Sequence, residues 1–180
     1  YRQKPRTAAM KEEVLRALKN KRSILFSPKS EKLQPFSLLL SVSDRHAVIL
    51  WALEQAEHAA RQLSCNGEPA LQCIRAAQMW ASGKIKMPVA KKSILACHAS
   101  AKQASDLSDA ALFHAVAQAC STVHTPRHGM GLPLYELTAI VRRFPQDWEE
   151  KVAERLSDYI TRLLYWQEHW QEQKEWASFL

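Results

Sequence analysis

Glycine is scarce in this sequence, with four among 180 residues, and long hydrophobic runs are missing. Glycine disfavours helices because it loses the most backbone entropy on ordering, so its scarcity favours helical structure. The apolar run SLLLSVS at 37–43 is far shorter than the roughly 18 apolar residues of a membrane-spanning helix. It also lacks the flanks of a signal peptide. We therefore expect a soluble, cytoplasmic protein with no membrane-spanning segment.

Common catalytic and metal-binding motifs are also missing. The cysteines at positions 65, 73, 97 and 120 form no CxxC pair, so their spacing excludes a zinc ribbon and predicts free thiols, buried at Cys97 and Cys120. No glycine-rich phosphate loop, HExxH or ExxH occurs. Cys120 lies four residues before His124, a spacing that leaves a Cys/His nucleophile as an alternative. Without a more complete catalytic pattern, we expect no enzymatic activity and no cofactor.

The remaining composition is typical of one globular domain that buries a core without disulfides or metals. Helical patterns follow one another along the chain, and no segment has a strand pattern that we would defend. We predict an all-α fold, a single-domain bundle of about seven helices built from antiparallel hairpins. Its parts are a basic N-terminal arm with a short helix at 1–32, a core at 33–145, and a C-terminal amphipathic helix with an aromatic tail at 146–180.

The predicted helices are bounded by capping residues, prolines and glycines. They span 10–21, 44–63, 69–82, 88–104, 108–125, 132–144 and 146–176. Residues 22–42 are expected to be irregular, because Pro28, Pro35 and several serines interrupt them. Ser43 and Ser108 are the predicted N-caps of the helices that follow them.

The helix at 108–125 is the predicted centre of the fold. Alanine dominates it, so its small side chains let other helices approach closely. Polar groups on a buried helix need partners, which makes His114 and Gln118 candidates for a site. If a short turn at 105–107 reverses the preceding helix, His98 lies level with His114 across the hairpin. We predict that these two histidines face each other.

The histidines also raise a metal-site alternative. His98 and His114, with a third group such as Asp44 or His46, would suit zinc or iron. His124 lies about 15 Å from His114 along one helix, so the histidines cannot all bind one ion. The other interpretation is a structural pair of buried histidines that hydrogen-bond their neighbours, with no metal.

Positive charge is concentrated at the N-terminus. The net charge is +7, and residues 1–32 hold ten Lys or Arg against three Glu, whereas residues 33–180 hold 15 charges of each sign. The arm has almost no aromatic side chains that could stack on bases. We therefore interpret it as a solvated arm with a surface helix, and keep nucleic-acid binding as an alternative. Met10 is a candidate for the natural start of the chain.

The C-terminal segment is rich in aromatic residues. Trp166, Trp170, Trp176 and Phe179 follow the apolar stripe of the last predicted helix. Such an end either packs on the body of its own chain or forms a contact between two copies. A homodimer through this segment is therefore one expected interaction.

Three segments together resemble a known family. They are DRHAVILWALEQAE at 44–57, WASGKIK at 80–86 and HAVAQACSTVHTPRHGMGLPLY at 114–135. The combination is similar to the immunity proteins found with bacterial polymorphic toxins, which are all-α proteins that protect the producing cell or its siblings. The resemblance covers roughly 44–142. It implies a protein that neutralises a protein toxin by stoichiometric binding.

The resemblance also implies which side chains form the site. By position, the family's polar pattern falls on Asp44, His46, Glu57, Trp80, His98, His114, His124 and His128. Gln118 joins them as a polar group on the central helix. The neutral body lacks the acidic face expected of an inhibitor of a nucleic-acid-cutting toxin, so we expect a toxin that is not a basic nuclease.

Overall fold

The computed structural model describes residues 6–180 and confirms the all-α fold. Eight α-helices and three short 3-10 helices follow one another in this range, without a strand. In chain order they are α1 (Arg6–Lys19), η1 (Glu31–Leu33), α2 (Gln34–Val42), α3 (Arg45–Arg61), α4 (Glu68–Ala81), α5 (Met87–Gln103), α6 (Leu107–Ser121), η2 (Pro126–Met130), α7 (Gly131–Arg143), α8 (Trp148–His169) and η3 (Trp170–Glu172). The first five residues of the predicted basic arm lie outside the described range.

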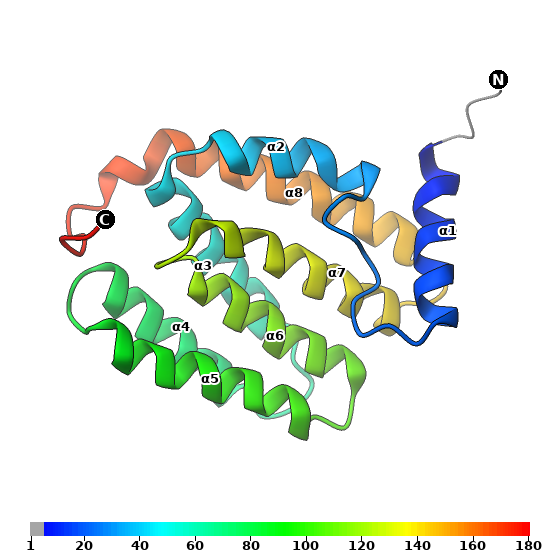
Figure 1. Ribbon diagram of the computed structural model, residues 1–180, viewed down its shortest axis with the longest axis horizontal. Helices are drawn as coiled ribbons and strands as arrows, with labels where there is room; N and C mark the ends of the chain where they lie inside the picture. Colours follow the sequence, from blue (N-terminus) through cyan, green and yellow to red (C-terminus); the bar gives the residue numbers. More distant parts are fainter. Residues whose placement is uncertain (1–5) are drawn as a thin grey trace.

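Helix α6 lies at the centre of the fold, as predicted. It packs against α3, α4, α5 and α7, which surround it in Figure 1. Ala115, Ala117 and Ala119 have no exposed surface. The distance between packed helices depends on the side chains at their contact, so these small residues let several helices approach α6 at once.

Helix α2 corrects the expectation that residues 22–42 are irregular. The chain is a loop only in the first part of this range, and α2 then begins at Gln34 with Pro35 in its first turn. The missing N–H of proline costs little there, because the first N–H groups of a helix have no partner inside it. With α2 added to the seven predicted helices, residues 6–180 contain eight α-helices.

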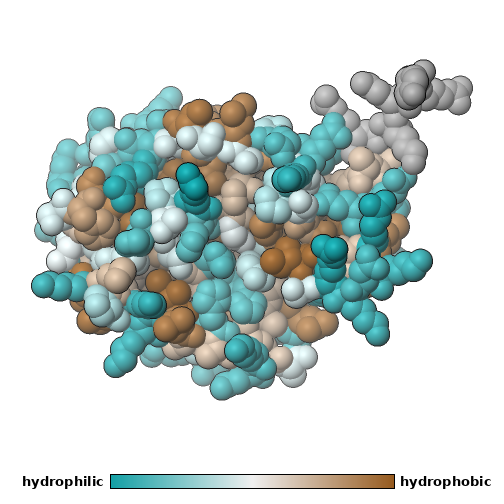
Figure 2. Space-filling view, in the orientation of Figure 1, coloured by the Kyte–Doolittle hydropathy of each residue, from teal (hydrophilic) through white to brown (hydrophobic). Residues whose placement is uncertain are grey.

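The two faces of α2 differ sharply in burial. Phe36 and Leu40 are buried, whereas Leu38 and Val42 are 67% and 70% exposed. Figure 2 shows an apolar patch over this helix, among hydrophilic side chains. Scattered exposed apolar residues are ordinary on protein surfaces, so the patch by itself does not indicate a binding site.

Two N-caps differ from the predicted ones by one or two residues. Asp44, and not Ser43, caps α3, and its carboxylate accepts the backbone N–H of His46 at 2.8 Å. Asp106 caps α6 through the backbone N–H of Ser108 at 2.6 Å. A carboxylate also interacts favourably with the positive end of the helix dipole, which explains why aspartate and not the neighbouring serine takes the cap.

The last helix ends earlier than predicted. Helix α8 stops at His169, the single turn η3 follows, and the chain from Gln173 onward is not helical. We call residues 170–180 the C-terminal strap. In Figure 1 the strap lies at the opposite end of the molecule from α1, beside the start of α3 and the turn between α4 and α5.

One hydrophobic core joins the helices. Its buried members run from Met10 on α1 to Leu163 on α8, so the first and last helices share it. Within residues 6–180, none of the helices combines the length and the apolar composition that crossing a membrane requires.

A buried polar network joins α7 to α3 and α8. The Glu136 carboxylate is fully buried and accepts hydrogen bonds from Arg155 Nε (2.8 Å) and the Tyr159 hydroxyl (2.5 Å). On its other side it contacts His58 Nδ1 (3.1 Å) and accepts a hydrogen bond from Gln62 Nε2 (2.8 Å). Burial alone raises the pKa of Glu136, but these hydrogen bonds and the charge of Arg155 outweigh burial and lower that pKa. The carboxylate is therefore ionised in the core.

Removing the cation of this network should destabilise the fold strongly. Arg155→Met leaves the Glu136 carboxylate buried without its charge partner, a change that costs about 3–5 kcal/mol. We expect the free energy of unfolding, measured by urea denaturation, to fall by about this amount. The control is Arg75→Met, which breaks the exposed ion pair between Arg75 and Glu68 and should cost less than about 1 kcal/mol. Equal losses in the two variants would contradict this role of the network.

Candidate functional site

His98 and His114 face each other across the α5–α6 hairpin, as predicted. Their Nδ1 atoms lie 2.7 Å apart, and the ring of Tyr135 on α7 packs against His114 at a centroid distance of 5.0 Å. One imidazole must donate and the other accept, so at least one of them is neutral. Burial lowers the pKa of both histidines. The charge of His114 lowers the pKa of His98 further, and the charge of Lys102 lowers that of His114 further.

This geometry does not support the metal-site alternative. Two imidazole nitrogens bound to one tetrahedral zinc ion lie about 3.3 Å apart, given bonds of about 2.0–2.1 Å. The shorter distance between His98 and His114 is that of a direct hydrogen bond. No group of three or more His, Cys, Asp or Glu side chains in residues 6–180 is arranged to hold a metal ion. The suggested third ligands, Asp44 and His46, instead contact each other at the start of α3.

The Asp44 side chain contacts His46, and His46 meets the C-terminal strap. Asp44 Oδ1 lies 2.8 Å from His46 Nδ1. The His46 ring stacks on Trp170, with centroids 4.5 Å apart and planes 10° apart, and meets the edge of Trp176 at 4.6 Å. Both indoles belong to the strap, so this end of α3 is covered by the last residues of the same chain.

Trp80 and His124 lie beside the same strap. Their rings are nearly parallel, with centroids 6.2 Å apart, and Phe179 of the strap lies 6.1 Å from Trp80. Trp80 is buried and His124 is exposed. Both line a cavity of about 580 Å³ together with Trp176 and Phe179. The fold thus gathers Asp44, His46, Trp80 and His124 from three distant parts of the chain around the strap.

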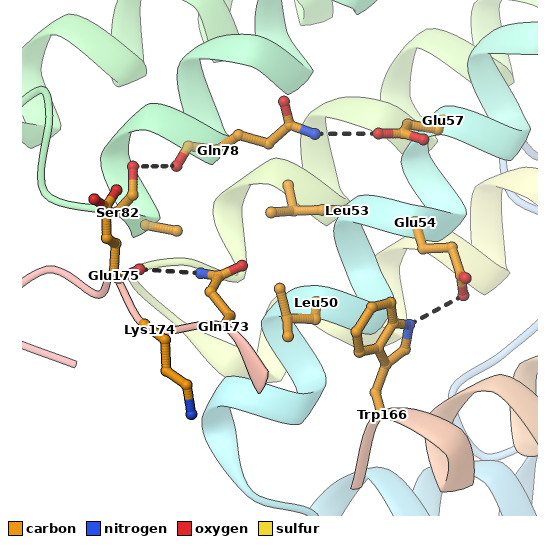
Figure 3. A pocket seen from close by; sticks show the side chains of 11 residues that line it. Leu50, Leu53, Glu54, Glu57, Gln78, Ser82, Trp166, Gln173, Lys174 and Glu175 are labelled. Carbon is orange, nitrogen blue, oxygen red and sulfur yellow. Dashed lines mark hydrogen bonds between the residues drawn. The ribbon is translucent and has the colours of Figure 1, made fainter. Parts of the chain in front are cut away.

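Glu57 lies at a second cavity, of about 590 Å³, between α3, α4, α8 and the strap (Figure 3). Figure 3 shows Glu57 at one rim, where it accepts a hydrogen bond from Gln78 at 3.1 Å. Trp166 forms another side and donates its indole N–H to Glu54 at 3.2 Å. Leu53 contributes to the apolar floor. The strap closes the remaining side, so it forms part of the wall of both cavities.

Gln118 and His128 line neither of these cavities. Gln118 lies one helical turn beyond His114, where α6 crosses the start of α7. A Cβ atom added at Gly131 would lie 2.8 Å from the Gln118 Cβ, so the glycine permits this close crossing. His128 is exposed in η2. The implied site residues therefore do not form one constellation: four surround the strap, Glu57 lies nearby, and His98 and His114 form a separate pair.

Three thiols that are far apart in the sequence meet in the core. Cys73, Cys97 and Cys120 are fully buried on α4, α5 and α6, whereas Cys65 is exposed. Hydrogen bonding with Cys120 raises the pKa of Cys73, and hydrogen bonding with Cys73 raises that of Cys97, with burial adding to both. Because Cys120 has no exposed surface and His124 stacks on another ring, the Cys/His nucleophile gains no support.

The buried Glu136 network escaped the sequence analysis. Its signal was a single carboxylate inside the apolar run LPLYELTAIV at 132–141, where neighbouring positions on α7 are buried. Arg155, its cation, lies 19 residues away on another helix, and no local pattern connects the two. The network is a structural element of the core, and Glu136 and Arg155 line neither cavity.

The family follows from a comparison over the segment that builds this geometry. A family model described as "Imm-5 like putative immunity protein" matches residues 38–164. The chain belongs to this family. Searches of the curated proteins and of the solved structures found no significant match. The family match confirms the resemblance to immunity proteins and extends it on both sides, back into α2 and forward along most of α8.

The Imm-5 like segment contains all nine of the implied site residues and ends before the strap. The strap, residues 170–180, therefore covers a surface that belongs to the family segment while lying outside the match itself. The cavities at Glu57 and at Trp80 are each lined by residues of the family segment and of the strap.

The histidine pair should make stability depend on pH. Folding lowers both pKa values, so the unfolded chain, with an imidazole pKa of about 6.5, binds protons more readily. The neutral pair therefore contributes its full stabilisation of the folded state above about pH 6.5. This contribution is lost as the pH falls below about 6.5 towards the lower pKa values of the folded protein. Between about pH 7.5 and about pH 5.5, we expect wild type to lose more free energy of unfolding than the variant His98→Gln/His114→Gln.

Urea denaturation at several pH values measures this difference. His128→Gln is the control, because it removes an exposed histidine from η2 and leaves the pair intact. Its pH dependence should follow that of wild type. If the double variant lost as much stability as wild type over this range, the pair would not be the group that titrates.

Proposed function

We propose that this protein neutralises a protein toxin by stoichiometric binding in the cytoplasm of a bacterium that carries a polymorphic toxin system. The observation that supports this proposal is membership of the Imm-5 like family over residues 38–164, because an immunity protein has a toxin as its partner. Inhibition by binding needs a complementary surface and no catalytic group. We accordingly propose a binding protein and not an enzyme.

The toxin-binding surface that we propose is the end of the molecule at the strap. The N-terminus of α3, the turn between α4 and α5, and the turn between α6 and η2 meet there. His46 lies in the first turn of α3, Trp80 in the last turn of α4, where it is buried, and His124 in the turn before η2, where it is exposed. Tryptophan is enriched among the residues that dominate binding energies at protein interfaces. This enrichment supports the choice of this end over the exposed apolar face of α2.

The charge distribution supports a restriction on the toxin. Residues 33–180 hold equal numbers of acidic and basic side chains, and the excess positive charge lies at the N-terminal end. Electrostatic complementarity steers partners together and excludes surfaces of the wrong sign. A strongly basic toxin, such as a nuclease with a nucleic-acid-binding face, would meet a body without net negative charge. We therefore propose a toxin that is not a basic nuclease.

The direct test is binding to the toxin encoded beside this protein. We expect a complex of one toxin with one immunity protein in size-exclusion chromatography with light scattering. His124→Ala, which truncates an exposed ring of the proposed surface, should raise Kd about tenfold in calorimetric titration. Glu154→Ala, an exposed change on α8 outside both cavities, is the matched control and should leave Kd unchanged.

The outcomes separate the function from the surface. A neighbouring toxin that forms no complex with the wild-type chain would contradict the proposed function. Normal affinity of His124→Ala would contradict the proposed surface and leave the function standing. The homodimer expected through the aromatic C-terminal segment stays a prediction, and the mass of the free protein in the same chromatography tests it.

A further inference from the structure

The strap covers the proposed binding surface, and its contacts are ones that a segment of a partner protein could also make. After η3, residues 173–177 are non-helical and a turn follows at 178–179, so that Trp176 and Phe179 lie three residues apart. Trp176 meets the His46 ring at 4.6 Å, and Phe179 lies 6.1 Å from Trp80. The strap thus contacts two of the implied site residues through aromatic rings.

The surface beneath the strap also offers a backbone acceptor. The carbonyl of Ala81, at the end of α4, accepts the N–H of Ala177 at 2.7 Å. Arg45 Nη1 on α3 lies 3.4 Å from the carbonyl oxygen of Phe179, near the end of the strap. These contacts bind main-chain atoms, so they would accept another non-helical segment regardless of most of its side chains.

Gly83 permits the close approach of the strap. Its φ is +79°, a left-handed conformation that strains other residues. A Cβ atom at this position would lie 3.3 Å from the Ala177 Cα, tighter than ordinary contact. The turn between α4 and α5 is thus shaped to receive a backbone at this point.

The strap is only partly packed: Ala177 is buried and Trp176 contacts the core, whereas its charged side chains and Phe179 are exposed. The ion pair between Lys84 and Glu175 has a separation of 3.7 Å, with side chains 61% and 73% exposed, so it adds little. Phe179 itself is 47% exposed. The cavities of about 580 and 590 Å³ beside the strap leave it incompletely packed. Segments with few buried contacts open locally without unfolding the rest of the protein.

We propose that the surface beneath the strap is a peptide-binding groove, and that a non-helical segment of the toxin carrying two aromatic side chains three residues apart replaces the strap there. This inference rests on the proposed function, since the incoming segment belongs to the toxin. The strap competes from the same chain at a high effective concentration, so a free peptide binds the closed form weakly. The toxin overcomes this competition through the further contacts of a complete interface.

The first experiment uses the full chain and a synthetic peptide with the sequence of residues 173–180, QKEWASFL. Trp176→Ala/Phe179→Ala removes the two aromatic anchors of the strap and leaves the groove intact. By nuclear magnetic resonance titration, the peptide should bind this variant one to one, with shifts at Ala81 and His46. Wild type should bind it at least about tenfold more weakly, because its own strap competes. The peptide QKEAASAL is the control and should bind neither protein.

Three results would overturn the groove. They are equal affinity of QKEWASFL for the two proteins, the absence of binding to both, and shifts confined to other parts of the surface. A dimer of wild type formed by exchange of straps would also overturn the proposal, because the occupant would then be a second copy of the chain. The melting of the variant, followed by circular dichroism, shows whether the fold is retained. If the variant does not retain the fold, Gly83→Ala takes its place, because a Cβ at Gly83 would press against Ala177 and displace the strap.

Hydrogen exchange tests the opening of the strap in the wild-type protein. The Ala177 amide should exchange at least about a hundredfold faster than the amides of α6, because it opens locally. Gly83→Ala should accelerate this exchange further, whereas Gly67→Ala, whose new Cβ would meet only Leu63 and the carbonyl oxygen of Ala60, should not. If the Ala177 amide were as protected as the amides of α6, the strap would not open locally and the inference would be wrong.

The toxin complex then separates this inference from the proposed function. When the strap is replaced, the Ala177 amide loses its acceptor, and its exchange in the complex should be faster than in the free protein. If a one-to-one complex forms and this amide is instead more protected, the toxin binds over the strap. The inference would then be wrong and the proposed function would stand.

Discussion

The close packing of helices around α6 is the constraint on which the rest of the structure depends. Its alanines bring α3, α4, α5 and α7 near one axis, and several features follow from this proximity. His98 reaches His114 across the α5–α6 hairpin, and Cys73, Cys97 and Cys120 meet although no local motif relates them. At the other side, Gly131 lets α7 cross directly over Gln118. A larger side chain on the contacting faces of α6 would separate these helices and with them each of these contacts.

The second determinant is the ionised Glu136, which fixes α8 against this bundle. Arg155 and Tyr159 bind its carboxylate from α8, while His58 and Gln62 bind it from the end of α3. A buried charge tolerates little displacement of its partners, so α8 is held in one position along its axis. That position decides where the strap leaves α8, and hence that the strap returns over the start of α3. A polar group in the core thus determines what covers the surface at the end of the molecule.

Several elements could be predicted from the sequence because their causes are local. Helical periodicity, prolines in first turns and the scarcity of glycine lead to the all-α class, and a short turn leads to the facing of His98 and His114. Helix α2 could not be predicted in the same way, because prolines and serines occur in loops as readily as in the first turn of a helix. The sequence also does not show that Asp44, His46, Trp80 and His124 lie close together. Their separation of up to 80 residues gives no indication that they share one strap.

The sequence by itself determined the helices, their central member and membership of the Imm-5 like family, since periodicity and the order of residue types are properties of the chain alone. Only the tertiary structure decided that Glu136 is a buried ionised group and that the aromatic end packs back on its own body. The physical reason is that both depend on contacts between helices far apart in sequence. Burial and partners set the ionisation of a carboxylate. Likewise, an aromatic segment packs on whichever apolar surface the fold places within its reach.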